Sequence, residues 1–141
     1  MSWADALENI NYLGVALGVV AALAIGAIWY APGAFGTMWG SLVGLKKKDM
    51  EDRSGMAVMM TMSVVFYAIV SLITSALYVM TSSDGMAEGL LLGAILGFTF
   101  GFGPLAVTYV FARRKFDLSL IDGGYIVVTC AVIGAVIGYI G

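Results

Sequence analysis

Four long apolar stretches, each about as long as the roughly 20 residues that a helix needs to cross a bilayer, constrain this chain most. They cover residues 12–30, 55–80, 86–111 and 120–140. In lipid, a helix satisfies its own backbone hydrogen bonds and an open strand does not. The sequence therefore predicts an all-α integral membrane protein, with residues 1–141 forming a single four-transmembrane-helix bundle.

The basic residues indicate how these spans are oriented. All seven Lys and Arg residues lie in two loops, one between the first two spans and one between the last two. These residues are Lys46, Lys47, Lys48 and Arg53, then Arg113, Arg114 and Lys115. Because Lys and Arg accumulate in cytoplasmic loops, we expect the N-terminus and the C-terminus to lie outside.

Composition argues against several functions. The chain is 61% hydrophobic and 11% charged, whereas soluble domains carry about 25% charged residues. It has no basic nucleic-acid surface and no His, the commonest metal ligand and the usual acid–base group. Its one cysteine, Cys130, excludes an intrachain disulfide. We expect no catalytic residues, no metal and no cofactor, and thus no enzyme.

A short segment after the first span has its own helical pattern. Its apolar residues Phe35, Met38, Trp39, Leu42 and Leu45 recur on one helical face. Since this segment is too short to span, we interpret it as a helix lying in the cytoplasmic interface. An irregular loop is the alternative, because glycine weakens a helix.

Small residues recur every four positions in three spans and predict helix contacts, since glycine lets backbones approach closely in lipid. A groove for a ligand or an acyl chain is the alternative. These helix-packing candidates are Gly14, Gly18 and Gly26, then Gly89, Gly93, Gly97 and Gly101, then Gly134 and Gly138. Pro104 interrupts the third span, where we expect a kink.

The second span carries a polar stripe formed by Ser63, Tyr67, Ser71, Thr74 and Tyr78. Lipid rejects hydroxyl groups unless they face protein, water or their own helix. One interpretation is hydrogen bonding between helices and back-bonding to the helix's own carbonyls. The other is the lining of a small polar cavity.

Asp122 is the one acid expected below the headgroups. Ser119 and Asp122 have the spacing of a capping box, which would make Asp122 a structural residue that also pairs with the basic loop at 113–115. A proton or ligand site is the alternative, because acids inside membranes are often functional. The dipole of the third span accounts for Glu88 in its first turn. The candidate functional or ligand-lining residues are Asp122, Tyr125, Glu88, Ser71, Thr74, Tyr67, Trp29 and Tyr30.

Several segments together resemble a bacterial membrane family, the domain of unknown function 1761. The most specific are Trp29-Tyr-x-Pro-x-x-Phe-Gly36 and Ile121-Asp-x-Gly-Tyr125; the others are residues 9–13, 88–93 and 109–111. The resemblance covers nearly the whole chain and implies a four-helix protein of the bacterial inner membrane, without implying an activity. Family members often have His where this chain has Ile126, and an acid–Gly–Arg loop where it has Ala-Arg-Arg after Phe111.

Two classes of function remain. The first is a self-associating or accessory scaffold or binding subunit, with the lipid bilayer and either further copies or a larger membrane complex as partners. The alternative is a transporter or carrier of a small or lipid-like molecule. We favour the scaffold, because coupled transport generally needs a titratable group at mid-membrane.

Overall fold

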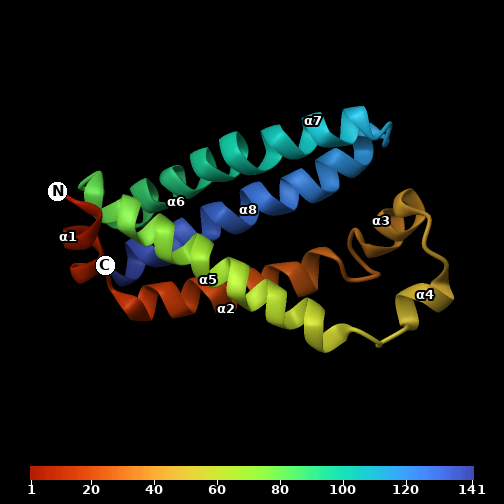
Figure 1. The fold of residues 1–141 in the computed structure, drawn as a ribbon, viewed down its shortest axis with the longest axis horizontal. Helices are drawn as coiled ribbons and strands as arrows, with labels where there is room; N and C mark the ends of the chain where they lie inside the picture. Colours follow the sequence, from red (N-terminus) through yellow and green to blue (C-terminus); the bar gives the residue numbers. More distant parts are fainter.

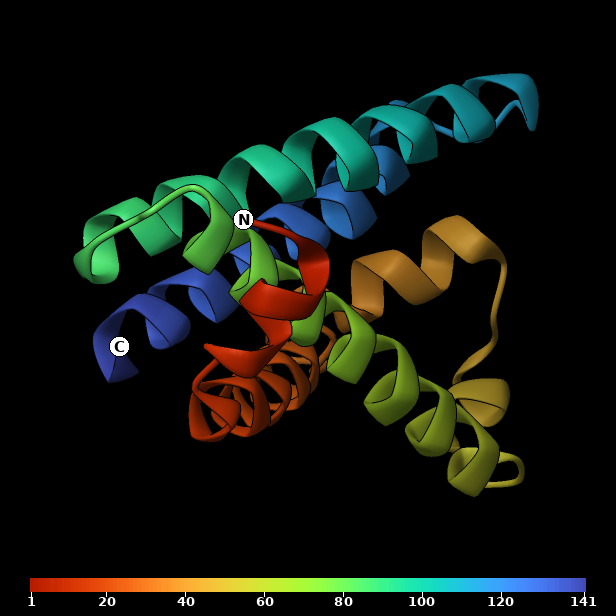
Figure 2. The ribbon, with the colours of Figure 1, turned by 60° about the vertical axis from the view of Figure 1, so that its left-hand side comes forward.

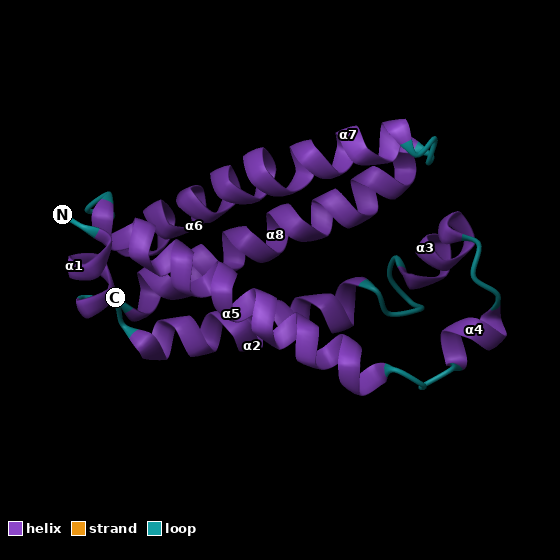
Figure 3. Cartoon of the chain, in the orientation of Figure 1, coloured by secondary structure: helices purple, strands orange, loops and turns teal.

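The computed structural model describes residues 1–141 and consists of helices without strands (Figures 1 and 3). In chain order the elements are α1 (Trp3–Glu8), α2 (Tyr12–Trp29), α3 (Gly36–Val43), α4 (Lys47–Glu51), α5 (Met56–Met80), α6 (Gly85–Leu96), the π-helical segment η1 (Gly97–Phe102), α7 (Gly103–Phe111) and α8 (Phe116–Ile140).

Four helical stretches are long and apolar enough to cross a membrane: α2, α5, the continuous α6–η1–α7 stretch and α8. The predicted all-α fold with four spans is therefore confirmed. The first three spans differ from the predicted bounds by one residue at one end.

The fourth span is the exception, because α8 begins at Phe116 and not near residue 120. Its first turn contains Asp117, which an apolar window excludes from a span. An acid there interacts favourably with the positive end of the helix dipole, so the helix continues past the apolar stretch.

The segment between the first two spans contains the predicted short helix, α3. It ends at Gly44, whose φ of 80° is the left-handed conformation that glycine adopts without strain. A second short helix, α4, follows within the basic loop.

Helix α8 lies at the centre of the fold, with α2 and α6 packed on either side (Figures 1 and 2). Its contact with α6 is a close approach of two backbones. A side-chain carbon added to Gly89 would collide with the Gly134 carbonyl, and one added to Gly93 would collide with the Cys130 carbonyl. Gly138 meets Gly85 in the same way.

The other small residues also face neighbouring helices. A side-chain carbon at Gly97 would lie 2.9 Å from the Val127 Cα, and one at Gly101 would collide with Ile126. On α2, Gly14 faces α8 and Gly18 faces both α5 and α8. These glycines bring α2 and α6–α7 close to α8.

The molecule opens toward one end. The chain termini lie together at one end, while α3, α4 and the loop between α7 and α8 lie at the other (Figure 1). Toward that second end, α5 diverges from α7 in both ribbon views (Figures 1 and 2). As a result, residues 56–62 of α5 are exposed on every face.

Pro104 lies just after η1, in the first turn of α7. Proline has no N–H to donate to the preceding turn, and the Gly103 N–H bonds to the Phe98 carbonyl five residues back. The sequence predicted a kink at Pro104; the structure has a π-helical segment, η1, just before this residue.

The sequence analysis missed α1. Its start is a capping box, in which the Asp5 N–H donates to the Ser2 hydroxyl and the Ser2 N–H donates to the Asp5 carboxylate. Ala6 of α1 packs against Ala76 of α5 at the end near the termini. The Ser2-x-x-Asp5 spacing was the available sequence signal.

Candidate functional site

The site is centred on the carboxylate of Asp122, which three helices surround. Tyr30 is the residue directly after α2, and its hydroxyl donates to Oδ1 of Asp122 at 2.6 Å. The Tyr109 hydroxyl of α7 donates to Oδ2 at 2.7 Å. Each carboxylate oxygen thus holds a tyrosine from a different span, and all three side chains are half-buried.

The expected capping role of Asp122 is wrong. Because α8 begins at Phe116, Asp122 lies nearly two turns inside the helix, and its carboxylate bonds to tyrosines and not to the helix N-terminus. The expected ion pair with Arg113, Arg114 or Lys115 is absent as well, since the one salt bridge in the chain joins Lys47 and Glu51.

A second pair of contacts fixes the neighbouring side chains. The Trp29 indole N–H donates to the Ile121 carbonyl at 3.0 Å, which holds α2 against α8 beside Asp122. The Tyr67 hydroxyl of α5 donates to the Tyr125 hydroxyl at 2.7 Å. Helices α2, α5, α7 and α8 therefore all contribute a polar side chain to this region.

Further aromatic rings pack against Tyr30 and Trp29, the two residues at the end of α2. The Tyr30 ring is 5.2 Å from the Tyr125 ring and 5.6 Å from the Trp39 ring, in edge-to-face arrangements. Trp29 is 4.8 Å from Phe35, at the start of α3. Two residues of the predicted apolar face, Phe35 and Trp39, thus pack on the end of α2, whereas Met38 of the same face is exposed.

Two glycines provide the room for these rings. A side-chain carbon at Gly26 would lie 3.0 Å from the Tyr125 hydroxyl oxygen. One at Gly123 would collide with the ring of Phe102. Gly26, three residues before Trp29, and Gly123, next to Asp122, are therefore part of how the site is built.

The remaining candidates lie elsewhere. Ser71 and Thr74 are buried in α5, where Ser71 donates to the Val15 carbonyl of α2 at 2.9 Å and Thr74 to its own helix. Glu88 lies at the opposite end of the molecule and accepts the Asp84 N–H at 2.7 Å. Of the eight candidates, the site brings together Asp122, Tyr125, Tyr67, Trp29 and Tyr30.

The polar stripe on α5 forms mostly hydrogen bonds to other helices and to the carbonyls of its own helix, as the first of the two interpretations predicted. Ser63 bonds to the carbonyl four residues before it, and Tyr78 reaches the Gly85 carbonyl at 3.5 Å. Thr129 of α8, which the sequence analysis did not single out, is fully buried and its hydroxyl has no hydrogen-bond partner.

Tyr109 and Trp39 are the residues of this candidate site that the sequence analysis did not list. The sequence analysis placed Tyr109 only in a segment that carries the family resemblance, and Trp39 in the short interfacial helix. The available signal was position: Tyr30, Tyr109 and Asp122 all lie near the span ends that face the two basic loops.

Chemically, the site is a carboxylate bonded to two tyrosine hydroxyls, with further aromatic rings packed against one of those tyrosines. The Asp122 carboxylate accepts one tyrosine hydroxyl on each of its two oxygens. It keeps free lone pairs, so it can bind a cation or accept a proton. Ile126, at the position where the resembling family often has His, packs against Gly101 of η1.

These features define a multi-pass helical membrane protein with a tyrosine-bound acid inside one span. A family model described as "Protein of unknown function (DUF1761)" matches residues 13–138, and the chain belongs to that family. Neither the curated proteins nor the solved structures contain a match. The segments around Tyr30, Tyr109 and Asp122, which carried the resemblance, meet at the site.

Proposed function

We propose that this protein is a membrane scaffold that associates with further copies of itself through the first half of α5. The observation that carries the proposal is the exposure of residues 56–62 on every face, in a helix whose second half is packed. Within lipid, helices associate through direct packing. A half-helix without an intramolecular partner offers such a surface.

The composition of this surface supports a protein partner. Met56, Met59, Met60 and Met62 are all exposed there. Methionine is flexible and adapts to irregular partners, and it is common at protein-binding surfaces. Two-fold assemblies, in which the same surface meets itself, are the commonest oligomers. A second copy is therefore the partner that we propose for the open half of α5.

Under this proposal the protein resides in the bacterial inner membrane with both termini outside, and it is not an enzyme. Its partners are the lipid bilayer and other copies of the chain or a larger membrane complex. Nucleic acid is not among them.

Cysteine crosslinking in native membranes tests the proposed surface. The background variant is Cys130→Ala, which removes the one native thiol. Val58→Cys on α5 should give a crosslinked dimer, because its side chain is 63% exposed within the proposed contact. The matched control is Val107→Cys on α7, which is 57% exposed toward the same end of the molecule.

Efficient dimer formation at position 58 with little at position 107 is the expected result. Equal crosslinking at both positions would indicate random collision and would contradict the assembly proposal. Co-purification of a different membrane protein, crosslinked at position 58, would replace self-association with an accessory role.

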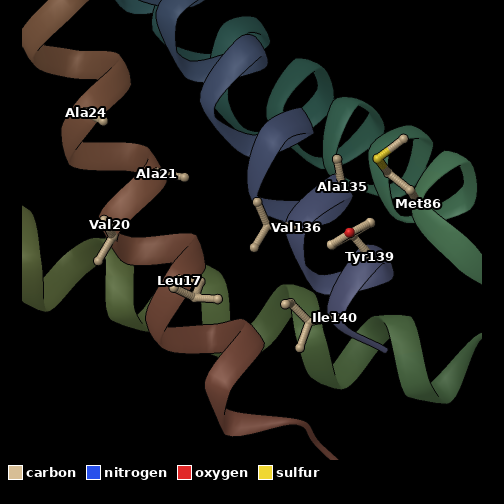
Figure 4. A pocket seen from close by; sticks show the side chains of 9 residues that line it. All are labelled: Leu17, Val20, Ala21, Ala24, Met86, Ala135, Val136, Tyr139 and Ile140. Carbon is tan, nitrogen blue, oxygen red and sulfur yellow. The ribbon is translucent and has the colours of Figure 1, made fainter.

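A carrier of a small or lipid-like molecule is the alternative. The Asp122 site favours it, as does an apolar groove of about 460 Å³ between α2 and α8 (Figure 4). The groove is lined by Leu17, Val20, Ala21, Ala24, Met86, Ala135, Val136, Tyr139 and Ile140. It lies along the middle of α2 and the C-terminal end of α8, away from Asp122, and suits an acyl chain.

A further inference from the structure

The Asp122 side chain is a half-buried acid in a membrane span with no basic side chain bound to it. Its two hydrogen-bond donors, Tyr30 and Tyr109, are neutral hydroxyls. No basic side chain comes within ion-pair distance, because the chain's one salt bridge joins Lys47 and Glu51 at 3.9 Å. Acids within membrane spans are normally paired. When Asp122 is ionised, the positive charge that pairs with it has to come from outside the chain.

The surroundings indicate which kind of cation fits. A divalent metal needs several oxygen, nitrogen or sulfur ligands, and no group of three or more His, Cys, Asp or Glu side chains exists in this protein. Aromatic rings instead gather beside one donor to the carboxylate: the rings of Tyr125 and Trp39 lie 5.2 and 5.6 Å from the Tyr30 ring. Aromatic rings attract organic ammonium groups through their electron-rich faces.

We propose that Asp122, together with Tyr30, Tyr109 and the rings of Trp39 and Tyr125, forms a binding site for an organic ammonium group. The carboxylate supplies the opposite charge, and the two tyrosine bonds fix its orientation. The rings supply a surface that suits an alkylated or aminoethyl cation better than a hydrated metal ion.

The position of the site admits two sources for this group. Tyr109 adjoins the basic loop, since its carbonyl accepts the Arg114 N–H at 2.9 Å. A phospholipid headgroup that carries both an ammonium and a phosphate could contact the carboxylate and that loop together. A free amine could enter from the same end. Either source presents the same ammonium chemistry to Asp122, and the proposal is independent of self-association.

Tryptophan fluorescence measures binding at the site. Two of the three tryptophans, Trp29 and Trp39, lie in the site, and Trp3→Phe removes the remote one. In the first arm, protein in phosphatidylglycerol nanodiscs is titrated with tetramethylammonium or ethylammonium chloride. Potassium chloride at the same ionic strength and the uncharged analogue neopentyl alcohol are the controls. In the second arm, phosphatidylethanolamine replaces part of the phosphatidylglycerol.

We expect a saturable spectral change with an ammonium probe in at least one arm, and none with potassium or the alcohol. Asp122→Asn should weaken binding by roughly tenfold or more, because loss of a partly buried charge removes its attraction for the cation. Glu88→Gln, which removes an acid at the opposite end, should bind like the parent. A response to the lipid alone identifies a headgroup, and a response to the soluble ion identifies a free amine.

Tyr109→Phe keeps the Asp122 carboxyl group, and it is the second test of the site if Asp122→Asn does not fold. Because the carboxylate then loses one of its two orienting bonds, this variant should bind several-fold more weakly. A response of equal size to potassium, an unchanged response in Asp122→Asn, or no ammonium response in either arm would each overturn the proposal.

Discussion

The side chain of Asp122 links elements that are remote in sequence. Its hydrogen bonds to Tyr30 and Tyr109 join α8 to the end of α2 and to α7 at one depth of the bundle. A hydrogen bond to a charged group contributes about 1.5–3 kcal/mol, more than one between neutral groups. The acid thus holds together the end of the molecule where α5 diverges from the other spans.

Buried hydroxyls in the same bundle differ in whether they have a partner. Ser71 donates to the Val15 carbonyl on another helix, whereas Thr129 is fully buried with no partner. An unpartnered buried hydroxyl destabilises a fold, and replacing it with an apolar group of the same shape removes that cost. Thr129→Val should therefore leave stability unchanged or raise it by up to about 1 kcal/mol.

The control for this prediction is Ser71→Ala, which should lower stability by roughly 0.5–1 kcal/mol, the usual contribution of a hydrogen bond between membrane helices. Thermal unfolding in mild detergent measures both variants. If Thr129→Val were as destabilising as Ser71→Ala, the Thr129 hydroxyl would have a bonding partner in the membrane-embedded protein.

At the level of whole helices, the contact between α6 and α8 determines how closely the spans approach. Gly89 and Gly93 on one side face Gly134 and the Cys130 carbonyl on the other, with no space for a side chain. Lipid tails are as apolar as the side chains that they contact, so close backbone packing supplies much of the association energy.

Gly93→Ala should lower the free energy of unfolding by about 1–3 kcal/mol, because the added methyl group collides with backbone and no flexible side chain can move aside. The control is Gly33→Ala, since nothing lies within 4 Å of a side-chain carbon at Gly33. Thermal unfolding in detergent and recovery of folded protein measure the effect. Equal stability of the two variants would contradict the close helix contact.

These elements also show what the sequence could predict. The spans and the short helix α3 follow from apolar length and spacing, and their bounds agree closely except at Phe116. A capping box was predicted at Ser119 because spacing alone cannot show that a helix has already begun one turn earlier. The bonds from Tyr30 and Tyr109 to Asp122 join positions that are 92 and 13 residues apart, and helix rotation decides such contacts.

At the scale of the whole molecule, the two loops that carry all the Lys and Arg residues lie at the same end. Both lie at the end where α5 diverges and where Asp122 is found, and both termini lie at the opposite end (Figure 1). Lys and Arg in short loops are retained on the cytoplasmic side. The ammonium site and the open half of α5 would then face the cytoplasmic half of the bilayer.

Reporter fusions test this orientation. Alkaline phosphatase fused after Gly141 should be active, because it folds only outside the cytoplasm, and a cytoplasm-dependent fluorescent reporter at the same point should be dark. Reporters fused after Met50, in the first basic loop, should show the opposite pattern, since that loop carries four of the seven basic residues. If the fusion at Gly141 were fluorescent, the orientation would be the reverse of the one we expect, and the Asp122 site would lie in the outer half of the bilayer. An ammonium ligand would then have to approach from outside the cell, and vesicles with the aminolipid confined to one leaflet would show this directly.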